Sequence, residues 1–141
     1  MPLSVSGMRI NLEIFGNPAP QGSKKIIHGR LIEASGEKLR KWRKEIARVC
    51  IEARAREEFF FLGPVRVEVT FYLPRPVSVK PEKRPLPIVP PDLDKLCRGL
   101  LDGIGQCEVF WGDDSQVVSL VASKVYADGR EPGASVSIQE I

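Results

Sequence analysis

Two pairs of aspartates are the residues in this chain best suited to chemistry. Asp92 and Asp94 stand one residue apart in PPDLDKL, and Asp113 and Asp114 are adjacent in WGDDSQV. Hard divalent cations such as Mg²⁺ take carboxylate oxygens from separate chain segments and keep water or substrate phosphate as their remaining ligands. A cation held by these pairs could generate hydroxide and neutralise charge that develops on a phosphodiester.

Two cations are embedded in the same cluster. Lys95 follows Asp94 directly, and Arg98 lies four residues after it. A lysine or arginine at such a site can hold a phosphate or stabilise a leaving oxygen. The aspartates, Lys95 and Arg98 together therefore indicate metal-assisted phosphodiester chemistry.

A purely local role explains the same carboxylates. Asp is a preferred N-cap and complements the helix dipole, and the prolines at 90–91 precede a helix start naturally. Asp94 and Asp102 are each four residues from Arg98, which is helical ion-pair spacing. The D-x-D spacing also occurs in phosphatases and transferases. The residues alone leave the structural and the metal-binding interpretations open.

Hydrophobic periodicity predicts the elements that position these residues. Alternation predicts strands, and apolar stripes of period 3.6 predict helices. The predicted strands cover residues 8–15, 65–72, 117–126 and 134–141. The predicted helices run from an N-cap at Ser35 to about Arg56 and from Asp92 to Ile104, with Gly105 as the stop. Residues 23–33 are predicted to form a hairpin or a basic arm. We expect an α/β (α+β) fold, a single small domain over 1–141 with a mixed sheet and two main helices packed on it.

Charge is distributed unevenly along the chain. The first sixty residues hold twelve Lys/Arg against seven Asp/Glu, and the rest hold nine against eleven. Phosphate contacts are expected from a basic helix face made of Arg40, Lys41, Arg43, Lys44 and Arg48. Solvated charge is the alternative for this face.

Residues 74–91 form a proline-rich stretch, which excludes a helix or a central strand. We expect an exposed, mobile loop that carries Lys80, Lys83 and Arg84. It could act as a substrate clamp or be a plain linker.

Cysteine usage and hydropathy exclude several classes of protein. The three cysteines form no C-x-x-C pair and there is one histidine, which argues against a disulfide framework and a Cys/His zinc site. Reduced thiols in a cytosolic protein are the simplest account. We expect no signal peptide and no membrane partner, because no apolar stretch approaches bilayer length.

The motifs resemble one known family. Asp92-Leu93-Asp94-Lys95-Leu96, then Leu101-Asp102-Gly103, then Trp111 to Val118 are similar in order and spacing to the D-L-D-N-L, F-D-A-L and D-D-x-Q-V motifs of the RusA family of Holliday-junction resolvases. The resemblance is strong over about the last third of the chain and weaker at Asn17-Pro18 and Leu73-Pro74.

The resemblance implies a small homodimeric endonuclease of phage or prophage origin that acts on branched DNA in the bacterial cytoplasm and needs Mg²⁺ or Mn²⁺. It implies that Asp92, Asp94 and Asp114 are catalytic and bind the metal, with Asp113 as the alternative to Asp114. The family's lysine falls at Arg98, which keeps the charge but cannot donate a proton near neutral pH. Lys95 could substitute for it.

We therefore expect a metal-dependent endonuclease that resolves four-way DNA junctions by paired symmetric nicks. The alternatives are a nuclease for flaps or other branched DNA, a non-catalytic branched-DNA-binding module, and a domain whose acidic cluster only caps helices. Metal-dependent cutting separates the nucleases from the module.

Overall fold

The computed structural model describes residues 8–22, 24–33, 36–57 and 60–141. The elements in chain order are β1 (Arg9–Phe15), β2 (Lys24–Ile27), β3 (Arg30–Glu33), α1 (Gly36–Arg56), β4 (Val65–Leu73), α2 (Leu93–Cys107), the 3₁₀ turn η1 (Asp114–Gln116), β5 (Val117–Tyr126) and β6 (Gly133–Glu140). All the predicted strands and both predicted helices are present, and the segment that contains residues 24–33 is a hairpin.

The main sheet has four strands in the order β1-β6-β4-β5. β6 pairs antiparallel with both β1 and β4, whereas β4 and β5 are parallel, so the sheet is mixed as predicted. Along β1 and β4 buried and exposed side chains alternate, because successive side chains of a strand point to opposite faces. The sheet therefore buries one face and leaves the other polar.

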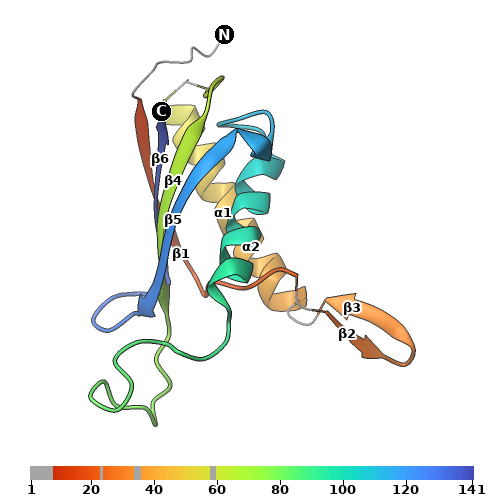
Figure 1. The fold of residues 1–141 in the computed structure, drawn as a ribbon, viewed down its shortest axis with the longest axis vertical. Coiled ribbons are helices and arrows are strands. Elements are labelled where there is room, and N and C mark those ends of the chain that lie inside the picture. Colours follow the sequence, from red (N-terminus) through yellow and green to blue (C-terminus); the bar gives the residue numbers. More distant parts are fainter. Residues whose placement is uncertain (1–7, 23, 34–35, 58–59) are drawn as a thin grey trace.

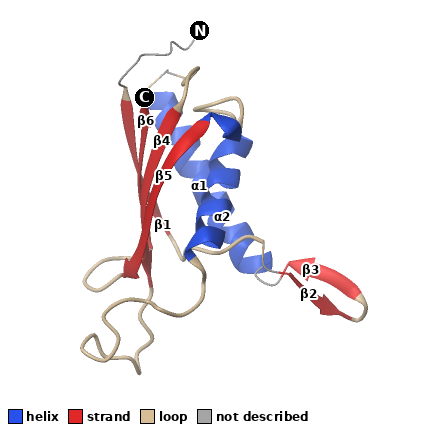
Figure 2. Cartoon of the chain, viewed as in Figure 1, coloured by secondary structure: helices blue, strands red, loops and turns tan. Residues whose placement is uncertain are grey.

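Both helices lie side by side on the buried face of the sheet, and the β2–β3 hairpin projects away from this body (Figure 1). Trp42 and Ile46 of α1 and Leu96 and Leu100 of α2 are almost fully buried in the core between the layers. A small α+β domain with two packed layers follows, with strands on one side and helices on the other (Figure 2). No helix in the described part of the chain is long and apolar enough to span a membrane.

The β4–α2–β5 unit decides where the motifs lie. Since β4 and β5 are parallel, α2 must run back along the sheet between them. The start of α2 therefore lies near the end of β4, and its end lies near the start of β5. With 15 residues, α2 is about 22 Å long.

The predicted stop of α2 at Gly105 is wrong. The helix continues to Cys107, and Glu108 takes the left-handed conformation with φ 52° and donates its N–H to the carbonyl of Gly105. Gly105 is required for space rather than for a turn, because a Cβ there would come within 2.0 Å of Oδ1 of Asp114. The predicted N-cap of α1, Ser35, lies outside the described residues.

Hydrogen bonds of Arg75, near the start of the 74–91 loop, and of Lys124 in β5 hold both ends of this loop. Arg75 donates to the carbonyl of Arg84 at 2.7 Å and pairs with Asp128 through two 2.8 Å bonds. Lys124 of β5 donates to the carbonyls of Val89 and Pro91, each at 2.9 Å. The loop therefore has fixed ends, and the mobility of its tip stays a prediction.

Candidate functional site

Two carboxylates at the start of α2 are exposed to solvent. Asp92 is the N-cap by backbone geometry, with φ −69° and ψ 141°, yet its side chain makes no capping hydrogen bond. Its side chain is 58 % exposed, and Asp94 in the first helical turn is exposed as well. Asp92 therefore does not cap the helix through its side chain, and its carboxylate oxygens can bind a ligand.

Lys95 is the cation beside Asp92. Its Nζ lies 3.7 Å from Oδ2 of Asp92, and its backbone carbonyl accepts a 3.0 Å hydrogen bond from the N–H of Gln21. The Gln21 side chain continues along the helix and donates to Oδ2 of Asp102 at 2.7 Å. The segment that follows β1 is thus bound to α2 over two turns, which fixes one side of the site.

Arg98 faces the next turn of α2 rather than its start. Its Nε lies 4.0 Å from Oδ2 of Asp102, and a Cβ added to Gly22 would come within 3.1 Å of its Nη1. Exposed pairs at this distance contribute little stability, so Arg98 keeps much of its freedom. The structure places Lys95, and not Arg98, in ion-pair range of Asp92.

Lys124 is a cation at this end that the sequence did not single out. Its two hydrogen bonds to the carbonyls of Val89 and Pro91 put the ammonium directly before Asp92. In the sequence it is one polar position in an alternating strand, so no local pattern could have found it. Only the pairing of β4 with β5 brings it to the start of α2.

Asp114 lies at the opposite end of α2. Its Oδ1 accepts a 2.8 Å hydrogen bond from Nε1 of Trp111, and its carboxylate packs against the backbone of Gly105. Trp111 is 1 % exposed, so this bond satisfies a buried donor.

Asp113 and Gln116 close the η1 turn as a capping box. Asp113 accepts a 2.8 Å hydrogen bond from the N–H of Ser115, and this bond lowers the pKa of the Asp113 carboxyl. The Gln116 side chain accepts from the N–H of Asp113 and donates to the carbonyls of Phe61 and Gly63. The D-D-x-Q motif thus has a structural role here, with Asp113 as its cap.

One copy of the chain does not bring the two aspartate pairs together. Asp94 and Gly105, the residue that Asp114 touches, are eleven residues apart on α2, which is roughly 16 Å along the axis. Among the described residues there is accordingly no group of three or more His, Cys, Asp or Glu side chains that could hold a metal ion.

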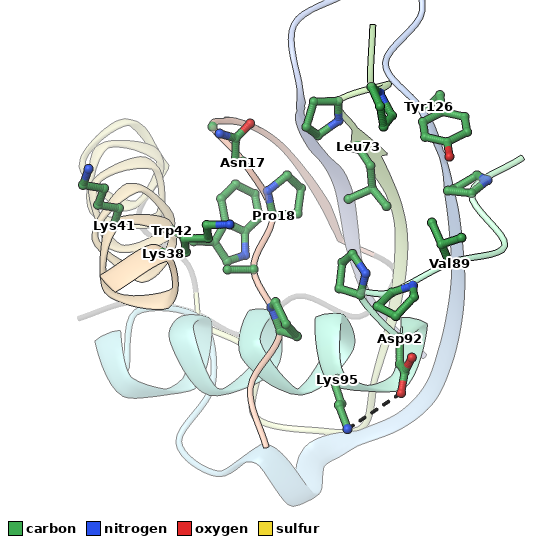
Figure 3. A pocket seen from close by; sticks show the side chains of 18 of the residues that line it. Asn17, Pro18, Lys38, Lys41, Trp42, Leu73, Val89, Asp92, Lys95 and Tyr126 are labelled. Atoms are coloured by element: carbon green, nitrogen blue, oxygen red, sulfur yellow. Dashed lines mark ion pairs between the residues drawn. The ribbon is translucent and has the colours of Figure 1, made fainter. Parts of the chain in front are cut away.

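A groove of about 1070 Å³ opens beside Asp92. Asn17, Pro18 and Trp42 lie along one side of it and Leu73, Val89 and Tyr126 along the other, with Asp92 and Lys95 at one end (Figure 3). Most of its wall is apolar, and prolines from the segments 18–20, 74–76 and 87–91 make up much of it. Such a concave apolar site beside a few polar groups is typical of ligand-binding sites.

The predicted DNA-binding cations differ in how free they are. Arg40 pairs with Glu37 at 3.0 Å, and Arg48 pairs with Glu45 and Glu52 on its own helix, where both carboxylates raise its pKa. Arg84 donates to the hydroxyl of Tyr126 at 2.7 Å.

Lys41 and Arg84 line the groove, as does Lys38, which was not among the predicted set. Lys44, Lys80 and Lys83 are exposed, while Arg43 is half-buried with an unpartnered Nη2. The groove therefore collects only part of the predicted basic surface.

Comparison with known proteins decides the family. The family model for the endodeoxyribonuclease RusA matches residues 16–139. The chain belongs to the RusA endodeoxyribonuclease family. A protein of Bacillus subtilis (strain 168), named uncharacterized protein YqaN, is 32 % identical over 143 aligned residues, which cover 94 % of this chain and 96 % of that protein.

Membership of the RusA family confirms the predicted resemblance and extends it beyond the last third of the chain. The match begins directly after β1 and includes the Asn17-Pro18 turn, both helices and the other three strands of the main sheet, so the fold described here is the scaffold of a RusA-type endodeoxyribonuclease. The roles predicted for Asp92, Asp94, Asp114, Lys95 and Arg98 stay predictions.

Proposed function

We propose that this protein is a metal-dependent, structure-selective endonuclease that resolves four-way DNA junctions by paired symmetric nicks, in DNA recombination and repair. The observation that carries the proposal is the pair of exposed carboxylates, Asp92 and Asp94, at the start of α2, where Asp92 makes no capping bond and lies beside Lys95 and a groove lined by four cations. The RusA family relationship supports nuclease chemistry at this site. We expect it to act in a bacterial cytoplasm and to be encoded by a phage or prophage.

The donors at the start of α2 fit Mg²⁺ or Mn²⁺. Asp92 and Asp94 supply carboxylate oxygens, the ligand type that hard cations prefer, and Asp92 keeps its oxygens free of capping bonds. When bound, the ion supplies Lewis-acid chemistry and neutralises charge on the scissile phosphate. The helix N-terminus carries partial positive charge, so a cation there needs more than one carboxylate to offset it.

A second copy of the chain can supply the missing carboxylate. β5 is an edge strand of the described sheet, and three apolar residues on it are partly exposed, Val118 by 62 %, Leu120 by 42 % and Val121 by 56 %. An exposed apolar edge strand is a template for pairing with another chain. We infer a dimer in which β5 pairs antiparallel with β5 of the partner.

Antiparallel pairing about a twofold axis reverses the two strands. Asp114 stands before the first residue of β5, whereas Lys124, near the last residue, contacts the loop that leads into Asp92. The pairing therefore directs the partner subunit's Asp114 toward Asp92 and Asp94. Two such sites arise per dimer, and a C2 dimer suits the near-twofold symmetry of a four-way junction.

Lys95 is the residue we assign to the scissile phosphate. Its ammonium lies beside Asp92 and can stabilise the leaving oxygen, and a lysine, unlike an arginine, is able to donate a proton. Arg98, one turn further along, holds a neighbouring phosphate through its exposed guanidinium. We propose these two roles for the cations at the start of α2.

Cleavage of a labelled four-way junction tests the function. The purified protein is incubated with the junction, a linear duplex and a flap of the same sequence, in Mg²⁺, in Mn²⁺ and in EDTA. We expect paired symmetric nicks in the junction only when a divalent ion is present. Preferred cutting of the flap would replace the proposed substrate, and binding without cutting in either metal would make the chain a DNA-binding module.

A mixture of two inactive variants tests the composite site. Asp92→Asn and Asp114→Asn are each expected to abolish cleavage, but in a mixed dimer one site receives both substitutions and the other receives none. We therefore expect the mixture to recover single nicks without paired cuts. If the site lay within one chain, each site of a mixed dimer would carry one substitution and the mixture would stay inactive.

A further inference from the structure

We propose that the groove beside Asp92 binds an unpaired nucleobase of the branch point, with its phosphate on the lysine rim. This inference rests on the proposed function and deepens it, because it names the feature of branched DNA that the protein recognises. The groove volume of about 1070 Å³ is at the upper end of ligand pockets, so a nucleotide fits with room for its sugar and phosphate.

Charge and shape of the groove match a nucleotide. Its lining includes four cations, Lys38, Lys41, Arg84 and Lys95, and two anions, Glu45 and Asp92. The walls between them are prolines and aliphatic or aromatic side chains, which suit the flat apolar face of a base. An apolar slot with a cationic rim thus fits a ligand that has an apolar body and an anionic backbone.

Contacts along one side of the groove hold that wall in place before a ligand binds. Arg84 from the loop donates to the Tyr126 hydroxyl at 2.7 Å, and the Arg75 guanidinium stacks on the Tyr126 ring at 4.0 Å. Lys124 holds the carbonyl of Val89 at 2.9 Å. A preformed site spends little free energy on ordering when it binds.

The position of the groove explains selectivity for branched DNA. Asp92 and Lys95 close one end of the groove, so a base bound there places its own backbone next to the proposed cleavage site (Figure 3). The bases of a linear duplex are paired and stacked and cannot enter, whereas a branch point offers bases that have lost part of their stacking. Phe15, 50 % exposed and also lining the groove, provides an aromatic surface for stacking.

A blocking substitution separates this role from general phosphate binding. Val89→Trp narrows the groove near Asp92 without changing its charge, because the Val89 side chain lines the groove while its carbonyl accepts the hydrogen bond from Lys124. Val77→Trp is the matched control, since Val77 is fully exposed on the same loop and does not line the groove. Phe15→Ala is a second variant that removes stacking surface instead of adding bulk.

Binding is measured in EDTA for a four-way junction, the same junction with one branch-point nucleotide made abasic, and a linear duplex. Stacking of one base is worth about 1–3 kcal/mol, so Val89→Trp should weaken junction binding roughly 5- to 150-fold and duplex binding hardly at all. Phe15→Ala should weaken it less, and Val77→Trp should not. Removing the base that enters the groove should weaken junction binding by the unmodified protein by the same factor. It should not change junction binding by Val89→Trp.

The outcomes distinguish this inference from the proposed function. If Val89→Trp and Phe15→Ala both bind the junction as the unmodified protein does, or if groove filling and base removal weaken binding additively at every branch-point position, the groove does not hold a base. The junction-cutting function would then stand. If the unmodified protein neither prefers nor cuts the junction, the proposed function itself fails.

Discussion

The two ends of α2 carry the same kind of residue in opposite states. At the start, Asp92 and Asp94 are exposed, and the Asp92 side chain makes no capping bond. At the far end, Asp113 caps η1 and Asp114 accepts from Trp111 while it packs on Gly105. The residue types alone therefore do not reveal the role of an acidic motif. The two motifs differ in whether their carboxylate oxygens already accept hydrogen bonds.

In the proposed dimer, the start of α2 from one subunit and the far end of α2 from the other form one metal site together. The far end holds Asp114 rigidly, and a fixed carboxylate is what a site at a subunit boundary needs if its ligands are to meet. At the start of α2, the Asp92 carboxylate is free of capping bonds, and Lys95 and Lys124 lie beside Asp92. The comparison therefore predicts that substitutions of Asp92 or Asp94 reduce cleavage alone, whereas substitutions of Asp113 or Gly105, which hold the far end in place, mainly reduce stability.

The largest expected effect is on catalysis at the start of α2. Asp94→Asn should lower the cleavage rate roughly 100- to 1000-fold, because a lost metal carboxylate removes several kcal/mol of transition-state stabilisation. Junction cleavage and thermal unfolding are both measured, and the melting temperature should hardly change. Asp113→Asn is the matched control, and it should keep activity while lowering the melting temperature slightly. Equal loss of activity in both variants would contradict the assignment of Asp113 to the cap.

Lys124→Met tests whether the strand positions the near end. The substitution keeps the aliphatic stem but removes both hydrogen bonds to the loop that leads into Asp92. Partners that orient a metal ligand typically matter 10- to 100-fold, so we expect a loss of about that size in cleavage rate.

The readout that identifies positioning is the metal concentration for half-maximal cleavage, which should rise in Lys124→Met. Lys124→Arg, which can still donate to both carbonyls, should recover part of the loss. A variant with lower activity but an unchanged metal requirement would show that Lys124 does not act through the carboxylates.

Gly105→Ala tests the close packing at the far end. A Cβ there would meet Oδ1 of Asp114 at 2.0 Å, so one side must move, and overpacking of this kind costs about 1–3 kcal/mol. We expect a lower free energy of unfolding in urea. Gly36→Ala at the start of α1, where nothing lies within 4 Å, is the control and should not destabilise the protein.

The double variant Gly105→Ala with Asp114→Ala sharpens this test. Removing the carboxylate makes room for the new methyl group, so the added cost of Gly105→Ala should largely vanish in that background. A full, additive cost would mean that the contact with Asp114 does not explain the glycine.

The smallest expected effect concerns alkaline pH and the buried thiols near the far end. Burial, with a smaller contribution from Cys107, raises the pKa of Cys50 from 9.0 to about 12. The folded state then holds a proton that the unfolded chain releases, so stability is full below pH 9 and falls as pH rises from 9 toward 12. The slope is about 1.4 kcal/mol per pH unit for one such group.

Cys50→Ala should reduce that slope, whatever it does to stability at neutral pH. Urea unfolding between pH 8 and pH 10.5 measures it. An unchanged slope would show that the Cys50 thiol does not ionise on unfolding in this range.

Much of the fold could be predicted because it depends on local patterns. Alternation in β1 and β4 and the stripe of α1 follow from which side chains must face the core, and the bounds agree to within a few residues. The end of α2 was missed because glycine has two uses. Gly105 looked like a helix stop, but it is a point of close approach to a residue nine positions later, which no local rule reveals.

By itself the sequence determined most of the secondary structure, the mixed α+β class and the family, and it predicted which aspartates do chemistry. Only the tertiary structure decided which of them are free, because the parallel pairing of β4 and β5 makes α2 run backward and separates the two acidic motifs by its length. The same pairing brings Lys124 to Asp92 and builds the groove from five separate stretches of chain. Such long-range contacts depend on the order of the strands in the sheet, which no local sequence pattern predicts.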